Sequence, residues 1–315
     1  MFTSKINALK VSIGEIIVGQ ERPIELLLTA IIADGHVLLE GVPGVAKTLL
    51  ARLAAKLIGA EYGRIQFTPD LMPSDVLGTE VYEQNLAQFR FHKGPVFAQI
   101  VLADEINRAP AKTQAALFEV MEERQVTVAG KTYQMGDLFN IIATQNPIEQ
   151  EGTYRLPEAQ LDRFLCKIIM DYPTAEEEVE ILRRHQTNHQ LVKLDHVKPI
   201  FTPEDIQQMR ETMKSVIVDD SIMRYIANIT SFTRNSEKIY LPASPRAAVC
   251  MMNMAKAYAL IQGRDFVTPD DVRYVTPSVL IHRIQLSTEA EMEGTNINAE
   301  IDRLLATASA ELFNE

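Results

Sequence analysis

The first half of the chain alternates short apolar runs with stretches of helical period. Runs that end at Gly, Pro or Asp predict buried strands, and five such candidates cover residues 37–39, 64–68, 100–103, 139–143 and 166–170. Helical patterns follow the first and third of these strands, at residues 47–58 and 110–124. Strands that alternate with helices predict an α/β fold, with a mostly parallel five-stranded sheet and helices on both faces.

Two segments of this region have the pattern of β-hairpins instead. Residues 79–91 alternate apolar and polar positions around Gln84-Asn85, and residues 125–133 do so around Ala129-Gly130. Both segments contain turn residues at their centre. We therefore expect two hairpins that project from the rim of the sheet and do not extend it.

From Tyr172 onward the pattern becomes helical. Thr174 and Glu177 have the spacing of a capping box, and three Thr-Pro or Ser-Pro pairs follow, at positions 202, 244 and 268. Each pair places a capping residue before a Pro at the first helical position. We therefore expect an α/β domain over residues 1–174 and an all-helical domain over residues 175–315, with the polar segment 185–197 as a loop.

Composition narrows the function and the cellular setting. The 315 residues are 46% hydrophobic and 23% charged, as in soluble globular proteins of about two domains. The N-terminus lacks the pattern of a signal peptide, and no apolar run reaches the ~20 residues of a membrane span. Two cysteines, Cys166 and Cys250, are too few for a disulfide framework and favour the cytoplasm. A net charge of −11 argues against general affinity for nucleic acid.

A glycine-rich loop lies between the first strand and the first helix. It reads Gly41, Val42, Pro43, Gly44, Val45, Ala46, Lys47, Thr48 and Leu49. In this context the pattern predicts a P-loop that binds ATP: its backbone N–H groups can surround phosphate oxygens, Lys47 can reach the β- and γ-phosphates, and Thr48 can ligate Mg²⁺. Ala46 stands where the general pattern has Gly, so a glycine-rich turn with an adjacent Lys is the alternative.

Polar residues follow two other strands. Asp104 and Glu105 come directly after the apolar run 100–103, and Thr144-Gln145-Asn146-Pro147 follows the run 139–143. The carboxyl ends of strands are where ligands bind in open α/β sheets. There Asp104 can hold Mg²⁺, Glu105 can activate water, and a polar side chain of the second segment can position that water. A helix cap and a strand-terminating turn are the alternatives for each segment alone.

On these residues the chain resembles the MoxR family of AAA+ ATPases over nearly its whole length. The stretches that carry the resemblance are 41–48, 66–75, 102–110 and 156–164. The resemblance implies a P-loop AAA+ core followed by an all-α lid, in which Ala before the P-loop Lys is usual. The hairpins are similar to the helix 2 insert and the pre-sensor 1 insert.

The resemblance also implies roles for residues outside the P-loop. Asn146 matches sensor 1, Arg163 the arginine finger that acts on ATP in a neighbouring subunit, and Arg246 sensor 2 of the lid. Gly19 and Gln20 match the segment that lines the adenine pocket. A local ion pair with Asp162 is the alternative for Arg163, and an ordinary surface position is the alternative for Arg246. Arg155 departs from the Pro of many relatives, either as an additional interface charge or as a solvated residue.

Proteins similar to this one form ATP-dependent rings, usually hexamers, that act as chaperone-like motors. They remodel or activate a protein client or assist insertion of its metal cofactor, often with partners that carry von Willebrand factor A domains. A nucleic-acid translocase is the alternative, because the same inserts occur in helicases; the acidic charge and the few basic residues of both hairpins disfavour it. A nucleotide switch without hydrolysis is disfavoured by the presence of Glu105 and Arg163.

Overall fold

A five-stranded parallel sheet forms the centre of the first domain. The computed structural model describes residues 2–147, 154–187, 194 and 197–312. The strands are β1 (Val37–Gly41), β2 (Tyr62–Gln66), β5 (Ile100–Asp104), β8 (Asn140–Gln145) and β9 (Cys166–Met170), in the order β2-β5-β8-β1-β9. All five predicted strands are confirmed. Their carboxyl ends lie at one edge of the sheet, with β1 between β8 and β9.

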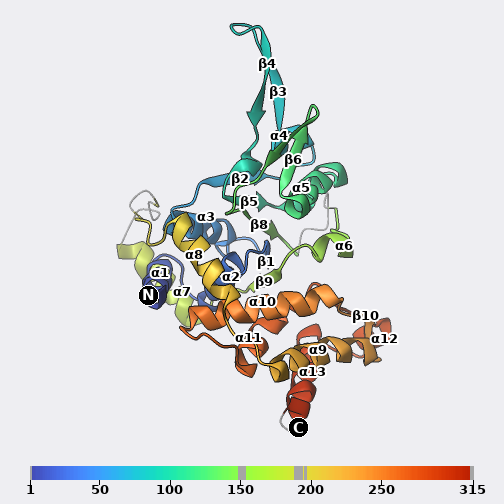
Figure 1. Cartoon of the computed structure of the whole chain (residues 1–315). Helices are drawn as coiled ribbons and strands as arrows, with labels where there is room; N and C mark the ends of the chain where they lie inside the picture. The colour runs from blue at the N-terminus through green and yellow to red at the C-terminus, as the bar shows by residue number, and fades with distance from the viewer. Residues whose placement is uncertain (1, 148–153, 188–193, 195–196, 313–315) are drawn as a thin grey trace.

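Helices cover both faces of this sheet, as the sequence predicts (Figure 1). One face carries α1 (Phe2–Gly14), α2 (Glu21–Ile32) and α3 (Lys47–Ile58), and the other carries α5 (Ala111–Glu123). Successive strand residues point to opposite faces, so Leu39 packs in the same apolar cluster as Leu50 of α3, whereas Leu38 packs in the cluster of Phe118 of α5. Strands buried on both sides therefore consist almost entirely of apolar residues.

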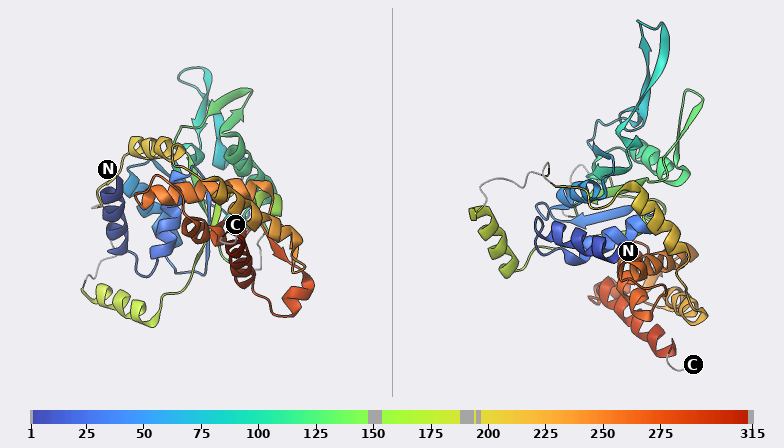
Figure 2. Two further views of the ribbon diagram at one scale, coloured as in Figure 1. Left: turned by 60° about the horizontal axis from the view of Figure 1, so that its bottom comes forward. Right: turned by 60° about the vertical axis from the view of Figure 1, so that its left-hand side comes forward.

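The two predicted hairpins are confirmed. They consist of β3 (Gly78–Glu83) with β4 (Gln88–Lys93), after the short α4 (Pro73–Leu77), and of β6 (Gln125–Val128) with β7 (Lys131–Gln134). Both extend away from the sheet in the same direction (Figures 1 and 2). Phe91 of one hairpin stacks on Tyr133 of the other, with 4.5 Å between the ring centroids. This aromatic contact fixes the two hairpins against each other.

The rest of the described chain is helical, apart from one short ribbon. It contains α7 (Ala175–Thr187), α8 (Pro203–Lys214), α9 (Asp220–Asn235), α10 (Pro245–Ile261), α11 (Pro269–Leu280), α12 (Thr288–Met292) and α13 (Ile297–Leu312). The ribbon pairs β10 (Ile239–Leu241) with β11 (Gln285–Leu286), antiparallel. The sequence did not predict it, because strands of three and two residues are too short to show an alternating pattern.

The helix starts agree with the capping pattern, and one predicted loop begins later than expected. Thr174 and Glu177 form the expected reciprocal hydrogen bonds, and capping boxes also start α8 and α11. Residues 185–187 belong to α7, whose acidic first turn and basic last turn both favour the helix dipole. Residues 188–193, 195 and 196 of the predicted loop lie outside the described residues.

The helical part packs against the sheet through α10 and α11. Helix α10 contacts α2 and α8, and α11 contacts the edge strand β9. Their side chains belong to the same apolar cluster as Leu39 and Ile31 of the first domain. Among the described helices, none has both the length and the apolar character needed to cross a bilayer.

His36, directly before β1, is buried between α5 and β8. Its Nδ1 accepts a hydrogen bond from the N–H of Ile141 at 3.0 Å, so Nε2 carries the proton and donates to the carbonyl of Met121 at 3.2 Å. Burial, with a smaller contribution from the charge of Arg124, lowers the pKa of His36 from 6.5 to about 4. The folded state therefore holds this ring neutral.

We predict that His36 makes the protein less stable as pH falls. Between the unfolded pKa of 6.5 and the folded pKa of about 4, only the unfolded state binds the proton. Lowering pH from 7 to 5 should therefore remove about 2 kcal/mol of unfolding free energy through this residue. Urea denaturation at both pH values should show a smaller pH-dependent loss for His36→Asn than for the unchanged protein. An equal pH-dependent loss of unfolding free energy in the two proteins would contradict the lowered pKa of His36.

Candidate active site

The P-loop joins β1 to α3 in a conformation that requires small residues. Gly44 and Ala46 have φ of 91° and 64°, in the left-handed region. A Cβ on Gly41 would lie 2.4 Å from the carbonyl oxygen of Met170 in β9. The left-handed conformation costs roughly 1–2 kcal/mol for a residue with a Cβ, which explains why P-loops generally have Gly at the position of Ala46. A turn of this kind can direct successive backbone N–H groups to one side, as an anion site requires.

The P-loop side chains lie beside the acidic residues of β5. The ammonium of Lys47 donates to the carbonyls of Gly41 and Val42, at 2.9 Å for the latter. The hydroxyl of Thr48 lies 3.4 and 3.3 Å from the two carboxylate oxygens of Asp104. Hydroxyl and carboxylate oxygens are the hard donors that Mg²⁺ prefers, so the side chains of Thr48 and Asp104 fit a magnesium ion.

Asp104 also ties together the ends of three strands. The hydroxyl of Thr144, in β8, donates to Asp104 Oδ1 at 2.7 Å and accepts from the N–H of Glu105 at 2.8 Å. Arg64, in β2, donates to Asp104 Oδ2 at 2.7 Å. The carboxylate is almost fully buried, at 6% exposure for the residue. A buried charge needs such partners, because desolvation disfavours it.

Glu105 is held at the same edge by two side chains that sequence analysis did not assign. Its backbone is left-handed, with φ of 58°, and its Oε2 accepts from Gln66 Nε2 and from Arg108 Nη1, both at 2.9 Å. Gln66 is the last residue of β2, beside the end of β5. The available signal was the position of Gln66 within a predicted strand, which ends at this residue in the structure. The partner of that side chain depends on strand order, which the pattern does not contain.

The other predicted nucleotide-binding residues lie along the neighbouring strand ends. Asn146 directly follows β8 and is 7% exposed. Gln20 donates to the carbonyl of Asp171 at 3.1 Å, one residue after Met170, which pairs with Gly41 of the P-loop. Gly19 has φ of 72°. Residues 19 and 20 therefore lie beside the end of β9, next to the strand that leads into the P-loop.

Arg163 and Arg246 lie together, on the other face of the sheet from α3. Glu122 Oε2 is 3.9 Å from Arg163 Nε and 3.4 Å from Arg246 Nη2. Arg163 also donates to the carbonyl of Phe118, which packs in the apolar cluster on the α5 face. Glu122 lines a cavity of about 290 Å³ together with Arg163. The structure thus brings these two arginines together and separates them from the P-loop helix of their own chain.

The structure decides the alternative for Arg163 and gives the positions of Arg246 and Arg155. Asp162 binds Arg283 of the helical part at 2.7 Å, and this contact replaces the local pair with Arg163 that the sequence allowed. Arg246 is the second residue of α10, after Pro245, although the hydroxyl of Ser244 makes no cap hydrogen bond. Arg155 is exposed and lines a cavity of about 880 Å³ between the two parts of the chain.

The fold and this site define a P-loop ATPase of the AAA class with a helical lid. A family model described as "ATPase family associated with various cellular activities (AAA)" matches residues 36–166, and one described as "AAA lid domain" matches residues 231–304.

More specifically, the chain belongs to the MoxR family of AAA+ ATPases. It is 43% identical to Chaperone MoxR1 of Mycobacterium tuberculosis, over 96% of this chain and 81% of that protein. It is 47% identical to the uncharacterized protein YeaC of Bacillus subtilis, over 93% of this chain and 91% of that protein. A crystal structure from Cytophaga hutchinsonii, described as a candidate ATPase, superposes with a TM-score of 0.88 at 42% identity and covers 97% of this chain and 94% of that one.

The left-handed conformation of Ala46 leads to a pair of opposite predictions. Ala46→Gly removes the Cβ and should preserve ATP binding within about twofold. Ala46→Val adds branching where φ is 64° and should weaken binding by roughly tenfold, equivalent to ~1.4 kcal/mol. Titration with a fluorescent ATP analogue measures both. Equal affinities for the Gly and Val variants would show that the loop changes conformation when it binds nucleotide.

Proposed function

We propose that this protein is a Mg-ATP-dependent ATPase that drives chaperone-like remodelling or activation of a protein client. The observation that carries the proposal is that Thr48, Asp104 and Glu105 lie close together at one edge of the sheet. We propose that residues 1–174 bind the nucleotide, that residues 175–315 form the lid, and that the protein acts in the cytoplasm. Two buried free cysteines support that location.

In this proposal the residues of the chain divide the chemistry among them. Lys47 exchanges its bonds to the carbonyls of Gly41 and Val42 for phosphate oxygens, and the P-loop N–H groups bind the same phosphates. Thr48 and Asp104 hold Mg²⁺, which when bound neutralises charge on the phosphates. Glu105 accepts the proton of the attacking water, and Asn146 orients that water. Gly19 and Gln20 line the adenine site.

The positions of Arg163 and Arg246 support a site shared between subunits. Both lie away from the P-loop helix of their own chain and share one carboxylate of Glu122. We propose that they reach the ATP of a neighbouring subunit, where its phosphates compete with Glu122 for the two cations. Such an arrangement needs a closed ring, for which the family resemblance favours a hexamer.

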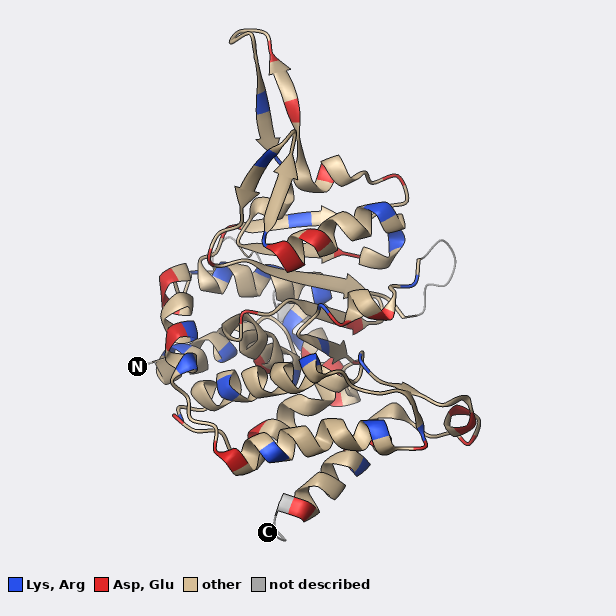
Figure 3. Ribbon diagram, turned by 45° about the vertical axis from the view of Figure 1, so that its right-hand side comes forward, with Lys and Arg blue, Asp and Glu red and all other residues tan. Residues whose placement is uncertain are grey.

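The projecting hairpins favour a protein client over nucleic acid. The β3–β4 hairpin exposes four apolar side chains, namely Val81, Tyr82, Leu86 and Phe89. Its Arg90 lies 3.7 Å from Glu83, and acidic and basic residues are interspersed along this hairpin (Figure 3). Nucleic-acid tracking needs an excess of positive charge. A partner with a von Willebrand factor A domain, and help in metal-cofactor insertion, are the specific forms of client action that we propose.

ATP binding and hydrolysis should separate by mutation. Lys47→Ala should abolish ATP binding, because the phosphates lose their main cationic partner. Glu105→Gln should bind ATP normally yet hydrolyse it at least ~100-fold more slowly, because the amide cannot accept a proton from water. Binding is measured by calorimetry and turnover by phosphate release. Equal turnover in Glu105→Gln and the unchanged protein would rule out Glu105 as the base.

Mixing two inactive variants should restore activity if the site is shared. Arg163→Ala retains an intact Glu105, and Glu105→Gln retains an intact Arg163. Loss of an arginine finger costs roughly 10³–10⁵ in rate, so each variant alone should be nearly inactive. In a mixed ring some contacts combine both intact residues, and ATPase activity should partly return. If co-assembled rings stay inactive, Arg163 does not act on a neighbour.

A further inference from the structure

The segment that carries Arg163 is held by an arginine of the lid. Arg283 lies just after α11, and its guanidinium spans the turn between α6 (Glu158–Leu161) and β9. Its Nε donates to Asp162 Oδ1 at 2.7 Å, and its Nη1 donates to the carbonyl of Leu165 at 3.0 Å. Its Nη2 donates to the carbonyls of Asp162 and Phe164. Arg163 thus lies within a segment whose flanking carbonyls all bind one side chain.

This contact is buried and specific for a guanidinium. The side chain of Arg283 is 2% exposed, and a further bond from Nη1 to the carbonyl of Val279, at 2.6 Å, fixes it to its own helix. The neighbouring His282 adds a bond from Nε2 to the carbonyl of Phe164, at 3.1 Å. A planar fork with five donors can bind several acceptors in fixed directions, whereas the ammonium of a lysine cannot.

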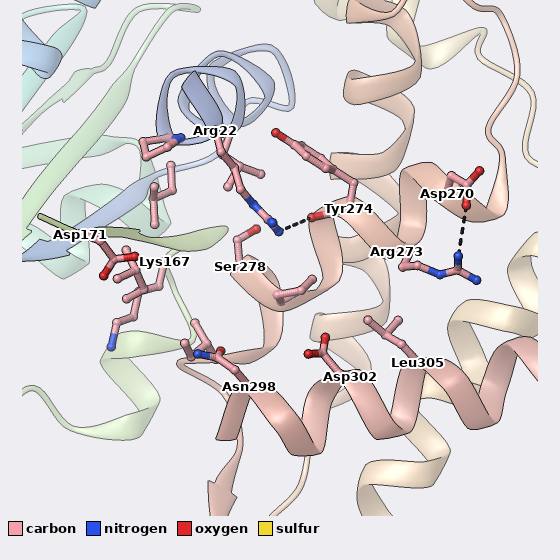
Figure 4. A pocket seen from close by; sticks show the side chains of 16 residues that line it. Arg22, Lys167, Asp171, Asp270, Arg273, Tyr274, Ser278, Asn298, Asp302 and Leu305 are labelled. Carbon is pink, nitrogen blue, oxygen red and sulfur yellow. Dashed lines mark hydrogen bonds and ion pairs between the residues drawn. The ribbon is translucent and has the colours of Figure 1, made fainter. Parts of the chain in front are cut away.

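Helix α11 of the lid contacts the edge strand β9 of the sheet. A cavity of about 600 Å³ lies on one side, between β9, α2, α11 and α13 (Figure 4). The cavity of about 880 Å³ lies on the other, and Lys167 and Ile281 line both. The C-terminal end of α11 therefore lies between the two cavities, and directly after it His282 and Arg283 bond to the first domain.

We propose that Arg283 is a positioning residue that makes Arg163 move with the lid. Arg246 lies in α10 of the lid, which packs on α11, so the lid carries Arg246 directly and Arg163 through Arg283. The two cations of the shared site then approach or leave the neighbour's phosphates together. A change of lid orientation in one subunit is thereby transmitted to the nucleotide of the next. This inference rests on the proposed action of Arg163 on a neighbouring subunit.

A second buried arginine provides a matched control. Arg210 of α8 is also buried, and it also joins the lid side of the chain to the first domain. It donates to the carbonyls of Ile31 and Asp137 and to Asn140 Oδ1, at 2.8–2.9 Å for the closest bond to each. These partners end α2 and precede or begin β8, at the same amino-terminal edge of the sheet as the segment 162–165, but they do not include that segment. Arg210→Lys should therefore destabilise the fold without displacing Arg163.

The first test compares Arg283→Lys with Arg210→Lys. Arg283→Lys should lower kcat roughly 10- to 100-fold, since displacement of a catalytic group by about 1 Å has effects of that size. Its KM and its affinity for ATP should stay unchanged, because the P-loop of its own chain is untouched. Arg210→Lys should lose about as much thermal stability as Arg283→Lys. Its kcat per folded subunit should nevertheless equal that of the unchanged protein. A normal kcat in Arg283→Lys, or an equal fall in both variants, would overturn the proposal.

The second test uses mixed rings to locate the defect. Arg283→Lys mixed with Glu105→Gln should regain activity, because one subunit supplies an intact base and the other a correctly placed Arg163. Arg283→Lys mixed with Arg163→Ala should show no activity above that of Arg283→Lys alone, because neither variant supplies a correctly placed finger. Recovery in the second mixture, or none in the first, would refute positioning by Arg283. If Arg163→Ala with Glu105→Gln also fails to recover, the shared site itself is refuted.

Asp162→Asn decides the question if Arg283→Lys does not fold. The amide keeps the shape and one acceptor of Asp162, whose side chain is 30% exposed, but it removes the charge that faces Arg283. We expect a fall in kcat of about three- to tenfold with unchanged KM, and recovery with Glu105→Gln. A kcat equal to that of the unchanged protein would overturn the proposal.

Discussion

The hydrogen bond between Thr144 and Asp104 is the contact on which the geometry of the site depends. It joins the ends of β5 and β8, and the same hydroxyl fixes the backbone N–H of Glu105. Because the sheet is parallel, β1 also ends at this edge and brings Thr48 to the same carboxylate. Glu105, Thr48 and Asp104 therefore keep their relative positions, because the buried carboxylate of Asp104 has partners on three elements.

The sequence was sufficient wherever function depends on residues that are close together in the chain. The P-loop could be predicted because a strand, a glycine-rich turn and a helix follow one another within residues 37–58. The acidic pair Asp104-Glu105 could be predicted because a buried strand needs only apolar residues until it reaches solvent. The sheet, both hairpins and the capped helices followed from the same local patterns, whereas the short ribbon of β10 and β11 did not.

Apart from Arg108, which lies three positions after its partner Glu105, the residues that were missed have partners far away in the sequence. Gln66 binds Glu105 on the neighbouring strand end, 39 positions away, and Glu122 contacts both Arg163 and Arg246, the latter 124 positions away. Nothing in the local pattern distinguishes Glu122 from the other exposed acids of α5, because its role comes from where the lid packs. Sequence analysis could name both arginines through a family resemblance, but it could not show that they lie together.

In the proposed shared site, each chain alone is incomplete, because its two arginines lie away from its own P-loop. A subunit that carried its own finger beside its own ATP would hydrolyse without assembling, and its lid would have no effect on its neighbours. Here Glu105 lies at the carboxyl edge of the sheet, whereas Arg163 and Arg246 lie beside Glu122 of α5. Arg246 belongs to the lid, and the segment of Arg163 is bonded to the lid by Arg283. In the proposed ring, hydrolysis at one contact depends on the lid of another subunit, which is the physical requirement for subunits that act in sequence.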